Sequence, residues 1–215
     1  MEIEWVAMHV IPESLPLHVQ RPIQTIQDER GQLDPEGILR PLLEKPDTLI
    51  YAEGEHDWRS QSADRCHLAP AASLVFWSAP PGRAELRDIL DQVAPRQVTW
   101  FGVATSSDQA QPFLTRLTGL VRFALKERAG RITLPELAAA TAQREGTVRL
   151  GLAWLEARGH IRLQPDGEAG FQVSAGGSPD MAASARIESD LAYMLQETAA
   201  FRAFCQQADL RLLLE

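Results

Sequence analysis

The chain has 215 residues, of which 45% are hydrophobic and 23% are charged, and its formal net charge is −8. This composition is typical of a globular protein, and the length allows two small domains or one large one. No apolar run is long enough for a membrane span, and Cys66 and Cys205 lack the spacing of a disulfide framework or a metal site. The N-terminal segment has no basic region of the kind that begins a signal peptide. We therefore expect a cytoplasmic protein.

Residues 1–112 alternate short apolar strands with helices. Helices are expected from Pro35 through Leu43 and from about Arg83 to Val93. The strands are short runs rich in apolar residues, and they cover Ile23–Gln27, Thr48–Ala52, Leu74–Trp77 and Gln97–Phe101. Such an alternation indicates a mainly parallel sheet that is covered on both faces. We therefore expect an α/β fold whose first domain, residues 1–112, is a Rossmann-like or helicase-like sheet.

Polar residues follow the predicted strands, at the edge of a parallel sheet where binding sites usually lie. None of these segments is a phosphate loop, because the chain contains neither GxGxxG nor GxxxxGK[ST]. Glu53, Glu55, His56 and Asp57 have side chains that could ligate a metal. Adjacent loop residues seldom converge on one ion, so we expect a solvated acidic loop there.

The other candidate chemical groups of the sequence are scattered. Asp28 and Arg30 could form a local ion pair at the end of the first strand, or bind a ligand. His67 and His160 lie beside strands or turns, and no Ser, Cys or Asp stands at a spacing from them that would indicate a catalytic arrangement. We therefore predict no catalytic residues, no bound metal and no cofactor.

A long helix from about Pro112 to Arg128 leads into a predicted winged helix-turn-helix, which we assign to residues 113–175. Thr133 is a good N-cap for a first helix that ends near Thr141. After a polar turn, a second helix is expected over Glu145–Arg158, with Gly159 as its cap. Two short strands, His160–Leu163 and Phe171–Val173, then flank a turn at Pro165–Gly167. This order of elements is that of a module that binds duplex DNA or, less often, protein.

The second helix of this module has few of the residues that read a DNA groove. Along the stripe of the helix that would face a groove, only the first part, with Gln143, Arg144 and Thr147, is of the polar kind that base edges require. Leu150 and Trp154 lie one turn apart, and their apolar side chains are poorly suited to base edges in a DNA groove. We therefore expect them to pack against the rest of the chain. The alternative is that Leu150 and Trp154 form a protein-binding patch.

Positive charge is concentrated in the same part of the chain. Residues 113–173 carry nine Lys and Arg against six Asp and Glu, whereas the residues on either side are net acidic. Any contact with nucleic acid is therefore expected to be weak and mostly electrostatic. The candidate residues are Arg122, Lys126, Arg128, Arg131, Arg144, Thr147 and Arg149. An ordinary solvated helix surface is the alternative interpretation of these cations.

The last part of the chain, residues 176–215, is expected to be a linker followed by a helix. Ser174–Pro179 is rich in Gly, Ser and Pro, and the helix should run over Met181–Leu214. Leu191, Leu195 and Phe201 give this helix an apolar face, with which it should dock on the body of the protein or on a partner.

The order of these segments resembles the C-terminal accessory region of RecJ-type single-strand-specific exonucleases. The resemblance covers nearly the whole chain, and each matching piece is short. The pieces are Asp28–Gly31, Leu49–Gly54, Leu74–Pro81, Pro95–Gly102, Gly146–Leu152 and Leu195–Arg202. In that family, cleavage depends on manganese or magnesium held by aspartates and histidines of the DHH and DHHA1 domains. This chain has no Asp-His-His motif, so no catalytic residue can be carried over.

The resemblance implies a non-catalytic accessory module of a RecJ-like 5′–3′ exonuclease that acts in DNA repair and recombination. Its expected partners are single-stranded DNA, single-strand-binding protein or a repair helicase, and a catalytic DHH/DHHA1 core in cis or in trans. One alternative is a winged-helix transcriptional regulator whose α/β half senses a small ligand near Asp28, Glu53 and Thr105. A second alternative is a metal-dependent enzyme with an unrecognised site in the acidic loops.

Overall fold

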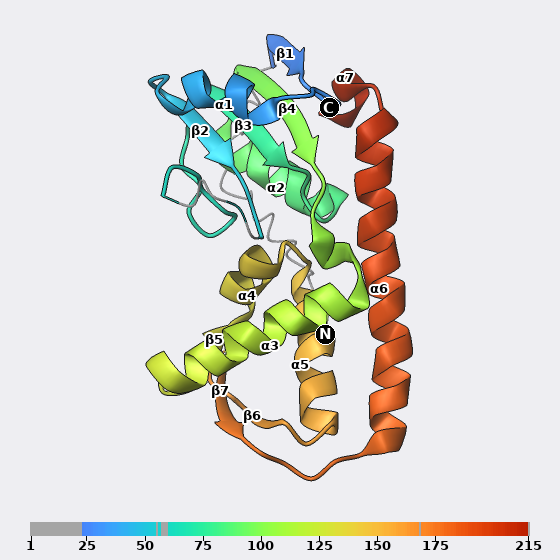
Figure 1. Cartoon of the computed structure of the whole chain (residues 1–215). Helices are drawn as coiled ribbons and strands as arrows, with labels where there is room; N and C mark the ends of the chain where they lie inside the picture. The colour runs from blue at the N-terminus through green and yellow to red at the C-terminus, as the bar shows by residue number, and fades with distance from the viewer. Residues whose placement is uncertain (1–22, 55, 57–59, 168, 215) are drawn as a thin grey trace, which may run out of the picture.

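A four-stranded parallel sheet forms one end of the protein, in a computed structural model that describes residues 23–54, 56, 60–167 and 169–214 (Figure 1). Its strands lie in the order β1-β4-β3-β2, and every neighbouring pair is parallel. The strands are β1 (Thr25–Asp28), β2 (Thr48–Tyr51), β3 (Ser73–Ser78) and β4 (Gln97–Val103). The predicted parallel α/β sheet is therefore confirmed, and all four strands lie within two residues of their expected bounds.

Side chains from alternate positions of the strands enter two separate cores, one on each face of the sheet. Helix α1 (Pro35–Leu43) packs over Val75 and Trp77, and helix α2 (Arg83–Val93) packs over Phe76 and Trp100. Burial on both faces explains why the strands are apolar at successive positions.

The second part of the protein is built from three helices and a small antiparallel sheet. Strands β5 (Arg131–Thr133), β7 (Gly170–Ala175) and β6 (Ile161–Pro165) pair in the order β5-β7-β6. The helices are α3 (Ala110–Glu127), which follows the short helix η1 (Ser106–Asp108), α4 (Leu134–Thr141) and α5 (Glu145–Ala157). Strand β5 was not expected, because a three-residue strand leaves no periodic signal in the sequence.

These elements surround one apolar core. As expected, the Thr133 hydroxyl caps α4, because it accepts a hydrogen bond of 3.4 Å from the amide of Glu136. Helices α3 and α5 pack closely at Gly151, where a Cβ would lie only 2.5 Å from Cδ2 of Leu117. The largest core side chains of this part include Phe113, Leu117, Leu134, Leu152 and Leu155.

Helix α6 (Met181–Gln207) runs along one side of the molecule and contacts both parts (Figure 1). Leu191 and Leu195 enter the core around α3 and α5, whereas Cys205 enters the core between α2 and the parallel sheet. The expectation that this helix docks on the body of the protein is therefore confirmed.

The C-terminal helix is shorter than expected. It ends at Gln207 instead of Leu214, because Ala208 is extended and Asp209 caps a new short helix, α7 (Leu210–Leu213). Arg30 follows β1 and donates hydrogen bonds of 2.7 and 3.0 Å to the carbonyls of Cys205 and Ala208. The same side chain forms the expected ion pair with Asp28, at 2.5 Å. The end of the first strand thus binds the end of α6.

Candidate nucleic-acid interface

Helix α5, the element expected to face a DNA groove, is covered by α6 along its length (Figure 1). Leu150 and Trp154 are half-buried and pack against the core that includes Leu191 and Leu195 of α6. The indole of Trp154 also lies 5.2 Å from the guanidinium of Arg158. These two apolar residues therefore pack within the chain as the sequence analysis preferred, although neither is completely buried.

The turn between α4 and α5 is docked on the loops that follow the parallel strands. The Gln143 amide donates to the Ser107 carbonyl at 3.0 Å and to the Asp108 carboxylate at 2.9 Å. Arg144 donates to the Pro81 carbonyl at 3.2 Å and forms an ion pair of 3.3 Å with Glu197 of α6. This turn is consequently engaged in internal contacts.

Two candidate nucleic-acid residues, Arg144 and Thr147, take part in this internal packing. Thr147 is completely buried in α5, so its hydroxyl cannot reach a base or a phosphate in this arrangement. Arg144 fits because Gly82 has no side chain: a Cβ there would lie 2.8 Å from Nε of Arg144. The interpretation of both residues as nucleic-acid contacts does not fit their positions. For Arg144, sequence alone could not show this, since its partners Pro81 and Glu197 lie more than 50 residues away.

Arg202 of α6 joins three segments at the junction of the two parts. It donates to the Ala79 carbonyl at 3.1 Å and to the Ala142 carbonyl at 2.5 Å, and it forms an ion pair with Asp108. Burial raises the pKa of Asp108 and lowers the pKa of Arg202. The sequence held a signal for this role, because Arg202 shares a helical face with the apolar residues Leu195 and Cys205.

The acidic loop after β2 begins with a buried ion pair. Glu53 is only 5% exposed, and its carboxylate accepts hydrogen bonds of 2.6 and 2.5 Å from the Arg65 guanidinium. The expectation of a solvated acidic loop is thus wrong for Glu53, whose partner Arg65 the sequence analysis missed. Glu55 and Asp57 lie outside the described residues. Within the part of the chain that the structure describes, no cluster of His, Cys, Asp and Glu is suited to holding a metal ion.

A Cys, a His and an Asp lie together in the loop before β3, although His67 was expected to lack such a partner. The Asp64 carboxylate lies 2.7 Å from Nδ1 of His67 and accepts a 2.9 Å hydrogen bond from the backbone amide of Cys66. Partial burial of the Cys66 thiol, with the nearby Asp64 charge, raises its pKa to about 11. The thiol therefore stays protonated at neutral pH, which does not suit a nucleophile.

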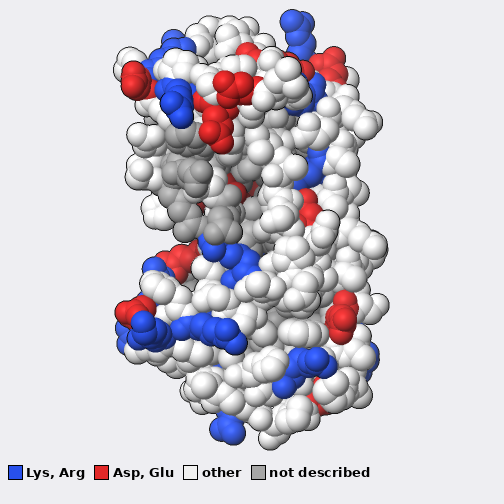
Figure 2. All heavy atoms as spheres, viewed as in Figure 1, with Lys and Arg blue, Asp and Glu red and all other residues white. Residues whose placement is uncertain are grey.

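The remaining candidate cations are exposed and most lie together. Arg122, Lys126, Arg128 and Arg131 follow one another along the end of α3 and the start of β5, where Lys and Arg gather in Figure 2. Arg128 forms a 3.2 Å ion pair with Glu136. Lys126 lies 3.1 Å from the carboxylate of Glu127. Among the described residues, no carboxylate forms an ion pair with Arg122 or Arg131. We call these four residues the α3 cation group.

Arg149, the last candidate, is exposed on α5 and lies 5.8 Å from the centroid of the Phe171 ring on β7. It is therefore available to solvent, but it belongs to a different element from the α3 cation group.

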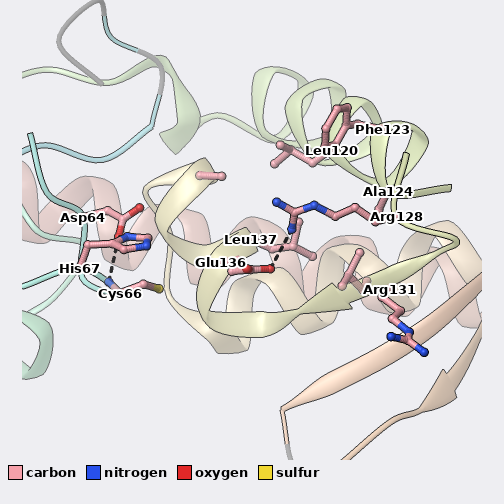
Figure 3. A pocket seen from close by; sticks show the side chains of 12 residues that line it. Asp64, Cys66, His67, Leu120, Phe123, Ala124, Arg128, Arg131, Glu136 and Leu137 are labelled. Carbon is pink, nitrogen blue, oxygen red and sulfur yellow. Dashed lines mark hydrogen bonds and ion pairs between the residues drawn. The ribbon is translucent and has the colours of Figure 1, made fainter. Parts of the chain in front are cut away.

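An aromatic side chain lies within the α3 cation group. Phe123 is 52% exposed, and the Arg128 guanidinium lies 5.8 Å from its ring centroid. Both residues border a cleft of about 300 Å³ between α3, α4 and the loop that carries Asp64 and His67 (Figure 3). We call this the Phe123 cleft. The cations near it are recognisable in the sequence but Phe123 is not, because an apolar residue in a helix is by default assigned to the core.

Within the described residues, no helix combines the length and the apolar character needed to cross a membrane. Comparison of the chain with protein-family models, with curated proteins and with solved structures finds no match.

Proposed function

We propose that this chain is a non-catalytic accessory module that binds single-stranded DNA weakly, as its resemblance to the C-terminal region of RecJ-type exonucleases implies. In this proposal, cleavage belongs to a DHH/DHHA1 core, in cis or in trans, and the chain alone does not degrade DNA. Contact with single-strand-binding protein or a repair helicase would place the module in DNA repair.

The proposal includes a winged helix over residues 113–175. Helix α3, strand β5, helices α4 and α5 and the β6–β7 hairpin follow the order of that module, and the sheet order β5-β7-β6 agrees with it. This order supports the assignment.

The observation that carries the proposal is that the exposed ring of Phe123 lies beside the α3 cation group, 5.8 Å from the guanidinium of Arg128. Exposed cations attract a phosphate backbone, and an exposed ring offers a surface on which bases stack whatever their sequence. The covering of α5 by α6 argues against groove reading by that helix, so the proposal favours a single strand over a sequence-specific duplex site. The transcriptional-regulator alternative depends on such a duplex site.

Fluorescence anisotropy with a labelled oligothymidylate at several salt concentrations tests the proposal. Contact with two to four phosphates predicts a slope of log K against log salt of roughly −1.4 to −2.8. The triple substitution Arg122→Gln, Lys126→Gln and Arg131→Gln should weaken binding and flatten that slope. Arg186→Gln, an exposed arginine of α6, is the matched control and should change neither.

Three results would contradict the proposal. Tight, sequence-selective duplex binding that persists at high salt would favour the regulator. Unchanged oligothymidylate binding in the triple variant would exclude the α3 cation group as the interface. Release of nucleotides by the purified chain in the presence of manganese, abolished by a substitution in this chain, would show a nuclease site.

A further inference from the structure

We infer that the Phe123 cleft accepts an unpaired nucleobase, which stacks on the exposed ring of Phe123 while the neighbouring phosphates contact the α3 cation group. This inference rests on the proposed function and goes further, because it names the part of the nucleic acid that is recognised and the side chain that recognises it. Its first support is the position of Phe123, whose ring is half exposed at the border of a cleft of about 300 Å³.

The floor of the cleft is apolar and is formed by two helices that pack on the same core. Leu120 and Ala124 come from α3, and Leu137 comes from α4 (Figure 3). Ala124 and Leu137 are buried, so this floor belongs to the folded core and does not depend on a mobile loop. A flat aromatic base is the part of a nucleotide that such an apolar surface can desolvate favourably.

Arg128 extends the flat surface that Phe123 begins. Its guanidinium lies 5.8 Å from the Phe123 ring centroid and is held at 3.2 Å from the Glu136 carboxylate. Figure 3 shows the guanidinium pointing into the cleft between Phe123 and Glu136. Guanidinium planes stack on bases as aromatic rings do, so an aromatic ring and a guanidinium are available to the same nucleotide.

The charges around the cleft complement a nucleotide better than an acidic peptide. Arg131 lines the cleft together with Arg128, and the exposed cations Arg122 and Lys126 follow on α3 outside the lining, where they can attract the phosphates of a bound strand. Asp64 and Glu136 line its interior and would repel a carboxylate, but they can accept hydrogen bonds from the amino or imino groups of a base. An acidic peptide is therefore the disfavoured occupant, and a base that is free to leave its stack is the favoured one.

Two oligonucleotides of the same length and charge separate base stacking from simple electrostatic attraction. One is a labelled oligothymidylate, and the other is an abasic oligonucleotide with the same backbone. Phe123→Ala should weaken oligothymidylate binding by roughly 5- to 100-fold, the range expected for the loss of stacking on one base, and should leave abasic binding unchanged. Phe204→Ala is the matched control, because Phe204 is 58% exposed on α6, and it should weaken neither.

A conservative variant provides a second readout. Phe123→Trp keeps an aromatic ring at the cleft and should retain oligothymidylate binding. Its added tryptophan fluorescence should be quenched by oligothymidylate but not by the abasic oligonucleotide, which reports stacking directly. Phe123 and Phe204 are both more than half exposed. Phe123→Ala, Phe123→Trp and Phe204→Ala should therefore show the circular dichroism spectrum and thermal midpoint of the parent chain.

The possible failures are distinguishable. If the triple charge variant weakens oligothymidylate binding but Phe123→Ala does not, the base site is overturned and the proposed function stands. If the parent chain binds neither oligonucleotide, both are overturned. If Phe123→Ala weakens the binding of polyglutamate as strongly as that of oligothymidylate, the cleft binds acidic peptide and the base assignment is wrong.

Discussion

Arg202 of α6 and Asp108 of η1 form a buried ion pair across 94 positions of the sequence. Asp108 lies between the parallel sheet and α3, and it also accepts a hydrogen bond of 2.9 Å from Gln143 of the α4–α5 turn. The same arginine binds the carbonyls of Ala79 and Ala142. Arg202 and Asp108 therefore join the two parts of the protein and keep the turn before α5 fixed against the strand ends.

Removing the arginine should consequently destabilise the whole chain. Arg202→Met leaves the Asp108 carboxylate buried beside carbonyls that have lost their donor, and a broken buried pair typically costs about 3–5 kcal/mol. Urea unfolding measures the change in free energy. Arg186→Met, on the exposed side of the same helix, should change it by less than about 0.5 kcal/mol.

A double substitution distinguishes loss of the pair from loss of packing. Adding Asp108→Asn to Arg202→Met removes the unpaired charge, so it should restore part of the lost stability. If Arg202→Met alone costs no more than Arg186→Met, the ion pair does not hold the two parts together.

Two helical glycines should respond to alanine in opposite directions. At Gly151 of α5, a Cβ would lie 2.5 Å from Leu117 and 2.8 Å from Phe113 of α3, so Gly151→Ala must separate these helices. We expect a loss of about 1–3 kcal/mol from this overpacking. At Gly119 of α3 a Cβ would meet nothing within 4 Å, so Gly119→Ala should gain about 0.5–1 kcal/mol through helix propensity. Thermal unfolding of both variants tests the two predictions. A stabilised Gly151→Ala variant would show that α3 and α5 leave room for a methyl group at this position.

Sequence alone predicted the regular elements well where burial leaves a local pattern, either one apolar stripe along a helix such as α2 or a run of apolar residues in a strand buried on both faces. The α2 bounds of Arg83–Val93 were predicted without error, and the parallel character of the sheet followed from strands that are apolar at successive positions. The strand order β1-β4-β3-β2 was not predictable, since no local pattern records which strands pair. The C-terminal helix was overestimated because Asp209, the N-cap of α7, was not recognised as the start of a new helix within an otherwise helical run.

The residues of the candidate site also fall into those that a local sequence pattern identifies and those whose surroundings depend on distant contacts. The cations of α3 were recognisable because an exposed helical face needs only local periodicity. The surroundings of Arg144 and Thr147 were not predictable: the partners of Arg144, Pro81 and Glu197, lie far away in the sequence, and no local pattern marks Thr147 as completely buried. Phe123 was missed because its exposure follows from the way α4 packs against α3, which leaves a cleft beside its ring.

Trp154 provides a measure of how firmly α6 covers α5. Its indole is half-buried against the core that Leu191 and Leu195 share, so Trp154→Ala should cost about 1–3 kcal/mol, less than for a completely buried tryptophan. Tyr193→Ala is the control, because Tyr193 is 62% exposed on α6, and it should change stability by less than about 0.5 kcal/mol. Urea unfolding that cannot tell the two variants apart would mean that α6 does not pack on Trp154 in solution.

The Cys66 thiol should be slow to alkylate even though the residue is exposed. Its pKa is raised from 9.0 to about 11, first by burial of the thiol and then by the Asp64 carboxylate. Only the thiolate reacts, so at pH 8 the reactive fraction should be about 100-fold smaller than for an ordinary thiol. Iodoacetamide labelling, followed by mass spectrometry of the Cys66 peptide, should show a rate that still rises above pH 10. The same peptide in the urea-unfolded chain should reach half of its maximal rate near pH 9.

Asp64→Asn tests the electrostatic part of this effect. The asparagine oxygen can still accept the hydrogen bond from the Cys66 amide, but the negative charge is lost, so the thiol pKa should fall and labelling at pH 8 should become faster. Glu136→Gln removes a carboxylate that also raises the pKa of Cys66, but it stands last among the causes, so this variant should change the rate less. Labelling of the folded parent chain that reaches half of its maximal rate near pH 9 would contradict the raised pKa and would make Cys66 available as a nucleophile beside His67.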